Sequence, residues 1–155
     1  QRGVPLRSVQ VQCSLLAPGD GQLKALLRCC RDLGVEVLAY SPLAFGVLSC
    51  PPRRQPQPST WLRRRLFRRL LPASLPLRQT LHAIARERDV TMTQVALNWC
   101  RASGATPIPG IRTTAQARDV GAALKWSLSD QEKKRLDRER DACNQRMPTN
   151  PFQSR

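Results

Sequence analysis

The segment 107–116 combines the residue types of an anion-binding turn. The apolar run at 105–108 predicts a short strand, and Pro109-Gly110 ends it. A threonine at position 113 or 114 can then cap a helix that starts near Ala115. Such a helix start leaves backbone N–H groups free to bind an anion, and Arg112 adds a guanidinium suited to a phosphate. The segment therefore predicts a phosphate site, with an ordinary strand-to-helix turn beside an exposed arginine as the alternative.

The overall composition limits the class of protein. The chain has 155 residues, which suits one domain or part of a larger one, and its start at Gln1 rather than Met indicates processing or a longer parent chain. No apolar run approaches the roughly 18–20 residues of a membrane span, and no signal peptide is visible. The net charge of +15 favours an anionic partner or a basic surface, while the excess of Arg over Lys fits function and coding bias equally.

The six cysteines show no spacing that predicts a metal site. No CxxC pair occurs, and His82, which is the chain's one histidine, has no cysteine at a ligand spacing. Cys29 and Cys30 are adjacent, and Cys30 falls on the apolar face of a predicted helix. We therefore expect free thiols in a reducing compartment, no metal, and a structural role for His82.

Apolar periodicity divides the chain into alternating strands and helices. Strands are predicted at 8–16, 35–40 and 105–108. A turn at 18–21, in which Asp20 can act as a cap, leads to an amphipathic helix over 22–33 that Gly34 ends. Two capping boxes open later helices, and the remaining helices are predicted over 77–88, from Thr91-x-x-Gln94 to Gly104, from 115 to 124, and from Ser129-x-x-Glu132 onward.

Residues 51–76 differ in composition from the rest of the chain. Several prolines precede a helical segment at 61–71 that is rich in arginine. The apolar residues of that segment are predicted to share one side, with arginines around them: Trp61, Leu62, Leu66 and Leu70. This basic insertion is either a surface segment that covers the domain, or an anion clamp, or a contact for a membrane surface or a nucleic acid.

The order of elements predicts an α/β fold. Strands that alternate with helices pair in parallel through right-handed crossovers. A complete TIM (β/α)8 barrel needs about 250 residues, so we expect a partial barrel made of the last three βα units plus a carboxyl-terminal helix. Residues 1–145 would form this part, and 146–155 an irregular tail. Phosphate commonly binds after strands seven and eight of such barrels, which matches the segment at 107–116.

Four stretches together resemble the carboxyl-terminal half of an aldo-keto reductase. They are Val9–Leu15, Val37–Leu48, Gln94–Trp99, and Pro107–Gly110 with Gln116. Their order and spacing are similar to the sixth, seventh and eighth barrel units of that family, and most similar to its plant and algal chloroplast-type members. The resemblance covers nearly the whole chain and is weakest at 51–76 and after 140. It implies an NADP-dependent oxidoreductase that reduces aldehydes or ketones to alcohols in the intact protein.

The resemblance also implies which residues contact the nicotinamide and the pyrophosphate of NADP(H). Gln10 corresponds to the glutamine at the nicotinamide carboxamide, and Tyr40 to the aromatic residue on which the nicotinamide ring stacks. Ser41, Leu43 and the loop to Gly46 correspond to the segment along the pyrophosphate. As alternatives without cofactor contact, Tyr40 is an aromatic residue at a barrel end and Gln10 is a polar strand residue.

The adenosine end of the cofactor is implied by residues of the segment 107–120. Gly110 and Arg112 correspond to the positions at the 2′-phosphate, which favours NADP over NAD. Gln116 and Asp119 correspond to the pair near the adenine. Val120 stands where the family often has Asn, so this chain departs from the family at one adenine contact.

The proton-transfer residues of the family have no counterpart in this chain. The resemblance places a Tyr acid, with a Lys, an Asp and a His around it, in the amino-terminal half of the family's fold, and neither Tyr40 nor His82 sits in a matching motif. We therefore assign no catalytic residue and expect the isolated chain to be inactive. Two alternatives stay open: a non-catalytic or regulatory nucleotide-binding chain, and a binder of anionic surfaces or nucleic acid through the arginines of 51–76, although no recognised nucleic-acid motif supports the latter.

The expected partners follow from these assignments. The intact protein would act on a small carbonyl compound, in the cytoplasm or the chloroplast and not as a secreted protein. Three barrel strands leave two open edges, and open edges pair with other chains. We therefore expect a fragment of a full reductase that is marginally stable by itself and prone to self-association.

Overall fold

Three parallel strands form the sheet at the centre of the structure, a computed structural model that describes residues 3, 5–18, 21–54, 56, 58 and 60–148. They are β1 (Ser8–Gln12), β2 (Glu36–Tyr40) and β3 (Thr106–Ile108), in the order β1-β2-β3. The register pairs Val11 with Ala39 and Ala39 with Pro107. Strands that follow one another in the chain are thus neighbours in the sheet, as they are in the wall of a (β/α)8 barrel.

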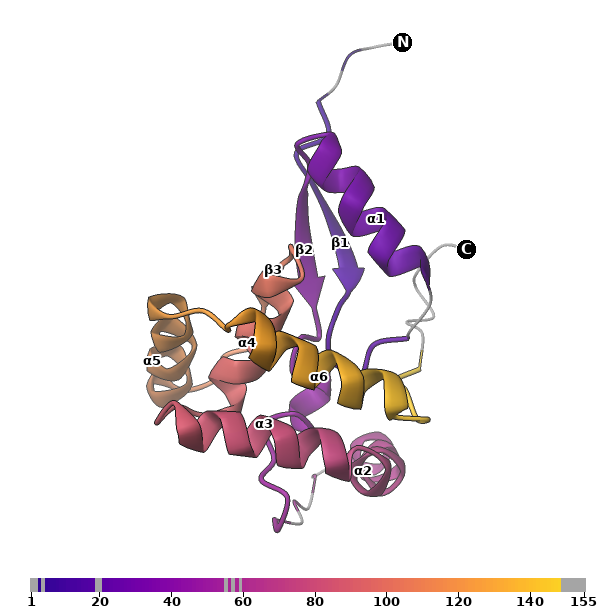
Figure 1. Ribbon diagram of the computed structural model, residues 1–155. Helices are drawn as coiled ribbons and strands as arrows, with labels where there is room; N and C mark the ends of the chain where they lie inside the picture. Colours follow the sequence, from indigo (N-terminus) through magenta and orange to yellow (C-terminus); the bar gives the residue numbers. More distant parts are fainter. Residues whose placement is uncertain are drawn as a thin grey trace.

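Helices connect the strands and cover one side of them (Figure 1). Helix α1 (Gly21–Asp32) joins β1 to β2, and Gly34, at φ +67°, ends the turn after it, as predicted. The short 3₁₀ turn η1 (Ala44–Gly46) follows β2 directly. The other helices are α2 (Trp61–Ala73), α3 (Leu75–Glu87) and α4 (Met92–Ala102) before β3, and α5 (Thr114–Ala122), the 3₁₀ turn η2 (Ala123–Lys125) and α6 (Asp130–Ala142) after it.

One face of the sheet packs against the helices, and the side chains on the two faces differ in burial. Val11, Val37 and Ala39 are buried in the apolar core that the helices share with the sheet. Because successive side chains of a strand alternate between faces, Gln10 and Tyr40 stand on the other face, where Gln10 is exposed and Tyr40 is half-buried. Within the described residues, β1 and β3 each pair with β2 and have no strand on their other side. The open edges expected from the sequence are therefore present in this part of the chain. Self-association through these edges stays a prediction.

The first strand is shorter than predicted. It ends at Gln12 instead of Leu16, because the apolar run that follows is a buried turn rather than a continuation of the sheet. In that turn the Leu16 N–H donates to Ser14 Oγ at 3.2 Å, and the Met147 N–H donates to the Leu16 carbonyl at 2.8 Å. A fully buried turn and a fully buried strand share the same apolar composition. The predicted cap Asp20 and the tail residues 149–155 lie outside the described residues.

Helix α2 forms where the arginine-rich segment predicted a helix, but its four apolar residues predicted to share one side do not all share it. Trp61 and Leu62 are 67% and 69% exposed, whereas Phe67 and Leu70 are buried. The helix turns its 63, 66, 67 and 70 positions inward, which is the i, i+3, i+4, i+7 pattern of a core-facing stripe. The leucines at 62, 66 and 70 are spaced by four residues, and such a row drifts around the helix instead of following one face.

A buried arginine attaches the proline-rich segment before α2 to the helices. Arg78 of α3 is 2% exposed. Its guanidinium donates to the carbonyl oxygens of Cys50, Pro51 and Leu71 at 3.0, 2.8 and 3.0 Å. Burial lowers the pKa of Arg78, and the three carbonyl groups compensate the desolvated cation. Arg78 thereby ties α3 to α2 and to the segment at 50–51.

The cysteines of the fold form no disulfide bonds. All six cysteines are free thiols, and Cys29 is the exposed one among them. In the part of the chain that the structure describes, no cluster of His, Cys, Asp or Glu could hold a metal ion. The same part contains no helix with the length and apolar character needed to cross a bilayer.

Candidate nucleotide-binding groove

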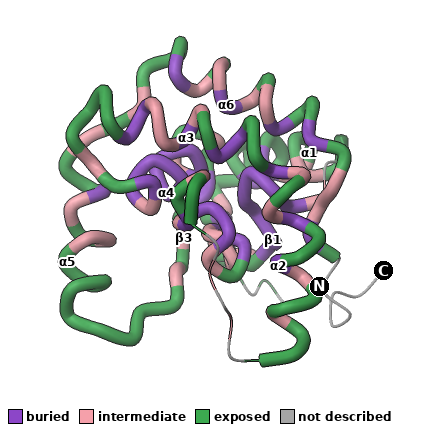
Figure 2. The backbone as a smooth tube through the Cα atoms, turned by 90° about the horizontal axis from the view of Figure 1, so that it is seen from below, coloured by how far each residue is buried: buried purple, intermediate pink, exposed green. Residues whose placement is uncertain are grey.

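A groove of about 430 Å³ lies where β2 and β3 end. Its walls come from the loop after β2, the turn after β3, three residues of α5 (Gln116, Asp119 and Val120), and one residue each of α2 and α4. Figure 2 shows α2 and α5 on opposite sides of this end of the molecule, with the strands between them. Seven of the nine predicted cofactor-binding residues line the groove: Ser41, Leu43, Gly46, Gly110, Arg112, Gln116 and Asp119.

The loop after β2 has an unusual backbone. Ser41, Ala44 and Phe45 have φ values of +52°, +49° and +57°, and Gly46 has a φ of +97°. Non-glycine residues in this left-handed region each cost of order 1 kcal/mol or more, and such residues cluster at binding sites. The Ala44 N–H donates to the Ser41 carbonyl at 3.0 Å, and the Gly46 N–H donates to the Leu43 carbonyl at 2.9 Å. These turns hold the loop along the groove, where its backbone can approach a ligand closely.

The turn after β3 has the form that the sequence predicted. Thr113, rather than Thr114, is the N-cap of α5, and its hydroxyl accepts a hydrogen bond from the Gln116 N–H at 3.2 Å. The Gln116 side chain in turn accepts from the Arg112 N–H at 2.8 Å. Arg112 is exposed at the groove, and the ion pairs formed within the described residues do not include it. The helix start and the guanidinium together make this end of the groove suited to a phosphate.

Asp119 lines the groove, but its carboxylate is held by α4. It accepts hydrogen bonds from Thr91 Oγ1 at 2.9 Å and from Gln94 Nε2 at 2.7 Å. Gln94 also accepts from Trp126 Nε1 at 3.1 Å. Asp119 therefore ties α5 to α4 and fixes the wall that carries Gln116, and its predicted contact with an adenine stays a prediction.

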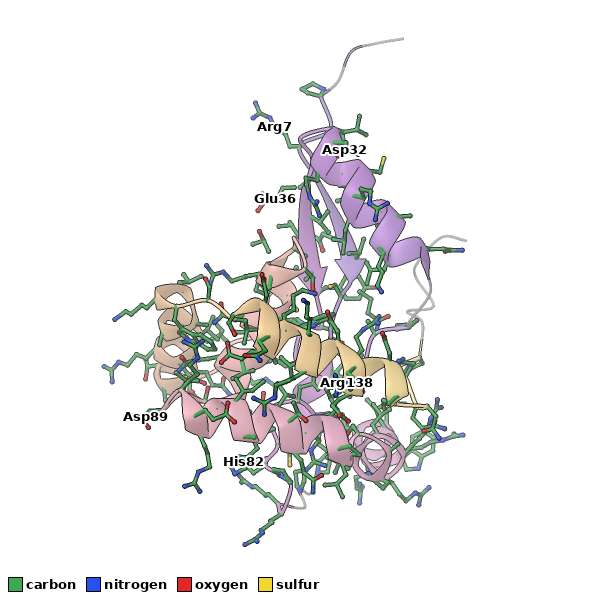
Figure 3. The ribbon with its side chains drawn as sticks, in the orientation of Figure 1. Arg7, Asp32, Glu36, His82, Asp89 and Arg138 are labelled. Atoms are coloured by element: carbon green, nitrogen blue, oxygen red, sulfur yellow. The ribbon has the colours of Figure 1, made fainter. Side chains whose placement is uncertain are left out.

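Gln10 and Tyr40 do not line the groove. Both lie on the face of the sheet opposite to Val11 and Ala39, Gln10 across from Leu38 in the register and Tyr40 at the end of β2, next to Ser41. The Tyr40 hydroxyl is enclosed without a hydrogen-bond partner. His82 lies outside the groove as well. Figure 3 shows it on α3, at the end of the molecule opposite to Arg7 and Glu36.

Arg63 is a groove residue that sequence reasoning did not single out. It comes from α2, and its Nη2 donates to the Phe45 carbonyl at 2.8 Å. The sequence did indicate that the arginine-rich segment could act as an anion clamp, without indicating which arginine would do so. Nothing in the sequence distinguishes Arg63 from Arg64 and Arg65, because the phase of the helix decides which arginine faces the groove.

The model of the aldo/keto reductase family matches residues 1–141. This chain belongs to the aldo-keto reductase family. It is 42% identical over 154 residues to a chloroplastic pyridoxal reductase of Arabidopsis thaliana, across 99% of this chain and 42% of that protein. It is 27% identical over 150 residues to a probable pyridoxal reductase 2 of Schizosaccharomyces pombe, across 87% and 45% respectively. The resemblance noted in the sequence is thus confirmed, and the chain spans less than half the length of these relatives.

Solved aldo-keto reductases have the same fold. A glycerol dehydrogenase from Gluconobacter oxydans matches with a TM-score of 0.76 at 23% identity, across 98% of this chain and 47% of that one. The aldose reductase from Schistosoma japonicum matches with a TM-score of 0.58 at 18% identity, across 85% and 33%. At these identities the likeness concerns the fold, and it confirms the predicted part of a TIM barrel. Members of the family generally use a nicotinamide cofactor.

Proposed function

We propose that the intact protein is an oxidoreductase that reduces an aldehyde or ketone with NADPH, and that this chain forms the phosphate-binding side of its cofactor site. The groove carries the proposal. Arg112 lines it next to the capped start of α5, and residues of the loop 41–46 line it as well. Membership in the family supports a nicotinamide cofactor. A free arginine at a helix start favours a dinucleotide with an additional phosphate, so NADPH is preferred over NADH.

The residues of this chain bind and orient the cofactor. Gly110 and Arg112 would hold the 2′-phosphate. Gln116 would contact the adenine on a wall that Asp119 fixes, and the loop with Ser41, Leu43 and Gly46 would lie along the diphosphate. The nicotinamide would then extend past the end of β2 toward the face of the sheet that carries Tyr40 and Gln10, against the Tyr40 ring and within reach of the Gln10 amide. When bound, the nicotinamide supplies the hydride, and the protein supplies the position from which it is transferred.

Pyridoxal is the first substrate to test. The Arabidopsis thaliana and Schizosaccharomyces pombe relatives carry the names of pyridoxal reductases, and pyridoxal is an aldehyde, which fits the proposed reaction. The 42% identity to the Arabidopsis thaliana protein also supports a chloroplast location for the intact protein. Expression of the intact protein with a fluorescent tag in plant cells would test that location.

NADPH titration of this chain, followed by tryptophan fluorescence, tests the proposed cofactor site. We expect saturable binding that is at least about tenfold tighter for NADPH than for NADH, since a charge-assisted hydrogen bond to the phosphate contributes roughly 1.5–3 kcal/mol. Arg112→Ala should remove that preference. Arg118→Ala is the matched control, because Arg118 is exposed on α5 and does not line the groove. Equal binding of the two cofactors by the unmodified chain would contradict the assignment of Arg112.

A second function is a nucleotide-binding chain without turnover. It is favoured by the contrast between the seven cofactor positions in the groove and the missing match to the family's proton-transfer residues. Incubation of the chain with NADPH and pyridoxal distinguishes the two. Binding without consumption of NADPH is expected for the chain by itself. Steady consumption would contradict the expected inactivity, and turnover restored by adding the amino-terminal half of a relative would favour the reductase.

A further inference from the structure

Two buried cysteines lie against each other where the sheet meets α4. Cys13 directly follows β1, and Cys100 belongs to the last turn of α4. Neither side chain is exposed to solvent. The Cys100 thiol donates to the Cys13 carbonyl at 3.5 Å, and the two thiols are also within hydrogen-bonding distance of each other. Two sulfur atoms that lie in contact can form a disulfide with little movement of the backbone.

The other four cysteines, all of which the structure describes, make different contacts. Cys50 and Cys143 donate to backbone carbonyl oxygens at 3.2 and 3.3 Å. Cys29 and Cys30 are neighbours on α1, where successive side chains point about 100° apart, and Cys29 is exposed whereas Cys30 is buried. The fold therefore brings together one pair of thiols among the six.

Cys13 lines a cavity of about 300 Å³ together with residues of α1, α4 and α6. Exposed side chains of α1, among them Lys24 and Arg28, form part of the lining, so the cavity opens to the surface. A water molecule takes about 30 Å³ in the liquid, so a small hydroperoxide has room to enter. Cys100 does not line this cavity. The two thiols thus differ in access, with Cys13 at the cavity and Cys100 behind it.

The lining of this cavity is cationic. It contains five Lys or Arg side chains and two Asp side chains. Each aspartate pairs with a cation of α6, Asp137 with Lys133 at 2.7 Å and Asp141 with Arg140 at 2.9 Å, which leaves the three cations of α1 in excess. Cationic surroundings favour the thiolate, which is the reactive form of cysteine.

The two thiols also differ in their tendency to ionise. The hydrogen bond from Cys100 and the charge of Arg140 lower the pKa of Cys13, against the opposing effect of burial. The hydrogen bond to Cys13 and complete burial raise the pKa of Cys100. Cys13 is therefore the nucleophile of the pair, and Cys100 is a neutral thiol beside it. A reactive cysteine next to a resolving cysteine is the arrangement found in redox-sensitive pairs.

We propose that Cys13 and Cys100 form a modification site, at which a small hydroperoxide converts the two thiols to a reversible disulfide. The Cys13 thiolate attacks one oxygen of the peroxide, the O–O bond breaks, and the other oxygen leaves as water or an alcohol with the proton that Cys13 has lost. The Cys100 sulfur then attacks the Cys13 sulfenic acid, an S–S bond forms, and water leaves with the proton of Cys100. The thiols lose two electrons and the peroxide gains them, and a dithiol reductant restores both thiols. No bound cofactor is needed, so this inference is independent of the proposed function.

Disulfide mapping after exposure to hydrogen peroxide tests the proposal. The full chain carries Cys29→Ser, which removes the exposed thiol that could link two copies. Free thiols are then blocked with N-ethylmaleimide, and the unreduced protein is digested with trypsin. The tryptic peptides 8–24 and 89–101 each contain one cysteine of the pair. We expect mass spectrometry to find these two peptides linked, dithiothreitol to separate them, and the remaining three cysteines to carry the blocking group.

Two single substitutions test the order of the steps. In Cys100→Ser the sulfenic acid of Cys13 has no partner, so dimedone, which reacts with sulfenic acids, should label peptide 8–24. In Cys13→Ser the same dose of peroxide should leave Cys100 a free thiol. Alanine replaces serine at either position if a variant does not fold, as judged by circular dichroism. Labelling of Cys100 in place of Cys13 would overturn the assignment of the nucleophile.

Arg140→Met tests the influence of charge at the cavity. Met keeps an apolar stem against Trp99, over which the Arg140 guanidinium lies at 5.8 Å, but carries no charge. We expect the disulfide to form several-fold more slowly in this variant. Lys134→Met is the matched control, because Lys134 is exposed on α6 and outside the cavity, and it should react at the unmodified rate. Equal rates in the two variants would overturn the role of Arg140.

Two results would overturn the modification site itself. One is the absence of the linked peptides at a dose of peroxide that oxidises the exposed Cys29 of the unmodified chain. The other is oxidation of Cys30, Cys50 and Cys143 to the same extent as Cys13, because that result would show damage without selectivity.

Discussion

Helices α4, α5 and α6 begin with the same sequence pattern, yet the pattern is used differently in each. A Ser or Thr cap is followed three residues later by Gln or Glu. At the start of α6 the pattern forms a complete capping box. Ser129 Oγ accepts from the Glu132 N–H at 3.3 Å, and the Glu132 carboxylate accepts from the Ser129 N–H at 2.7 Å. Both halves of the motif serve the helix itself.

At the two helix starts beside the groove, only the hydroxyl half forms. Thr91 and Thr113 each accept a backbone hydrogen bond at 3.2 Å. The glutamine side chains turn elsewhere, Gln94 to Asp119 and Trp126, and Gln116 to the Arg112 N–H. A local motif therefore predicts where a helix starts, but the surroundings decide what its third residue binds. Here Gln116 lines the groove itself, and Gln94 bonds to Asp119, which lines it.

Removing Glu132 should have the largest effect on stability. Its carboxylate completes the capping box and accepts a bidentate pair from Arg88 at 2.7 and 2.8 Å. We expect Glu132→Ala to lower the free energy of unfolding by about 2–4 kcal/mol, the combined scale of a cap and a charge-assisted hydrogen-bond pair. Denaturant unfolding measures this. Glu139→Ala in the same helix is the control, and an equal loss there would mean that the box is unimportant.

The same carboxylate makes stability depend on pH. Hydrogen bonds from Arg88 and Ser129 lower the pKa of Glu132 from 4.5 to about 2. Because the folded-state pKa is depressed, this stabilisation is present above about pH 4.5 and is lost as the pH falls toward 2. The melting temperature of the unmodified chain should fall over that range. Glu132→Ala should show a smaller fall, and identical pH profiles would contradict the assignment.

Gln94→Ala should have a smaller effect on stability and a larger one on cofactor binding. It removes the hydrogen bonds to Asp119 and Trp126, and we expect a loss of about 1–2 kcal/mol in unfolding free energy. Because Asp119 ties α5 to α4, the wall that carries Gln116 should loosen and NADPH should bind several-fold more weakly, as titration would show. Glu132→Ala, measured where it is folded, is the comparison. A greater loss of NADPH affinity in Glu132→Ala would contradict this contrast between the helix starts.

The fold could be predicted where periodicity is unambiguous. The mostly apolar run at 35–40 predicted β2 within one residue of its observed bounds, and the 3.6-residue pattern predicted α1 at 22–33 against an observed Gly21–Asp32. The prediction was wrong where one sequence pattern is compatible with two different local structures. The apolar run after Gln12 suits a strand and a buried turn equally. The shared side predicted for the apolar residues of α2 was wrong because four-residue leucine spacing does not determine the phase of a short helix.

The groove was predictable in part, for two different reasons. The turn 109–116 follows from local chemistry, since a glycine turn, a hydroxyl cap and an arginine are read directly from neighbouring residues. The positions in the loop after β2 came from the family resemblance, and its left-handed residues Ser41, Ala44 and Phe45 give no local signal, since none of them is glycine. Arg63 depends on how α2 packs, which is a tertiary property that no short stretch of sequence determines.

The cap of α5 should give the smallest effect on stability and the clearest link to the groove. Helix α5 has no fully buried residue, so Thr113→Ala should cost only about 0.5–1 kcal/mol, the lower part of the range for a lost cap. The same change loosens the helix start beside Arg112, so binding of adenosine 2′-monophosphate should weaken about two- to fivefold. Thr113→Ser keeps the capping hydroxyl and should restore both quantities. If Thr113→Ala changed stability alone, the start of α5 would be an ordinary capped turn, which is the alternative that the sequence left open for this segment.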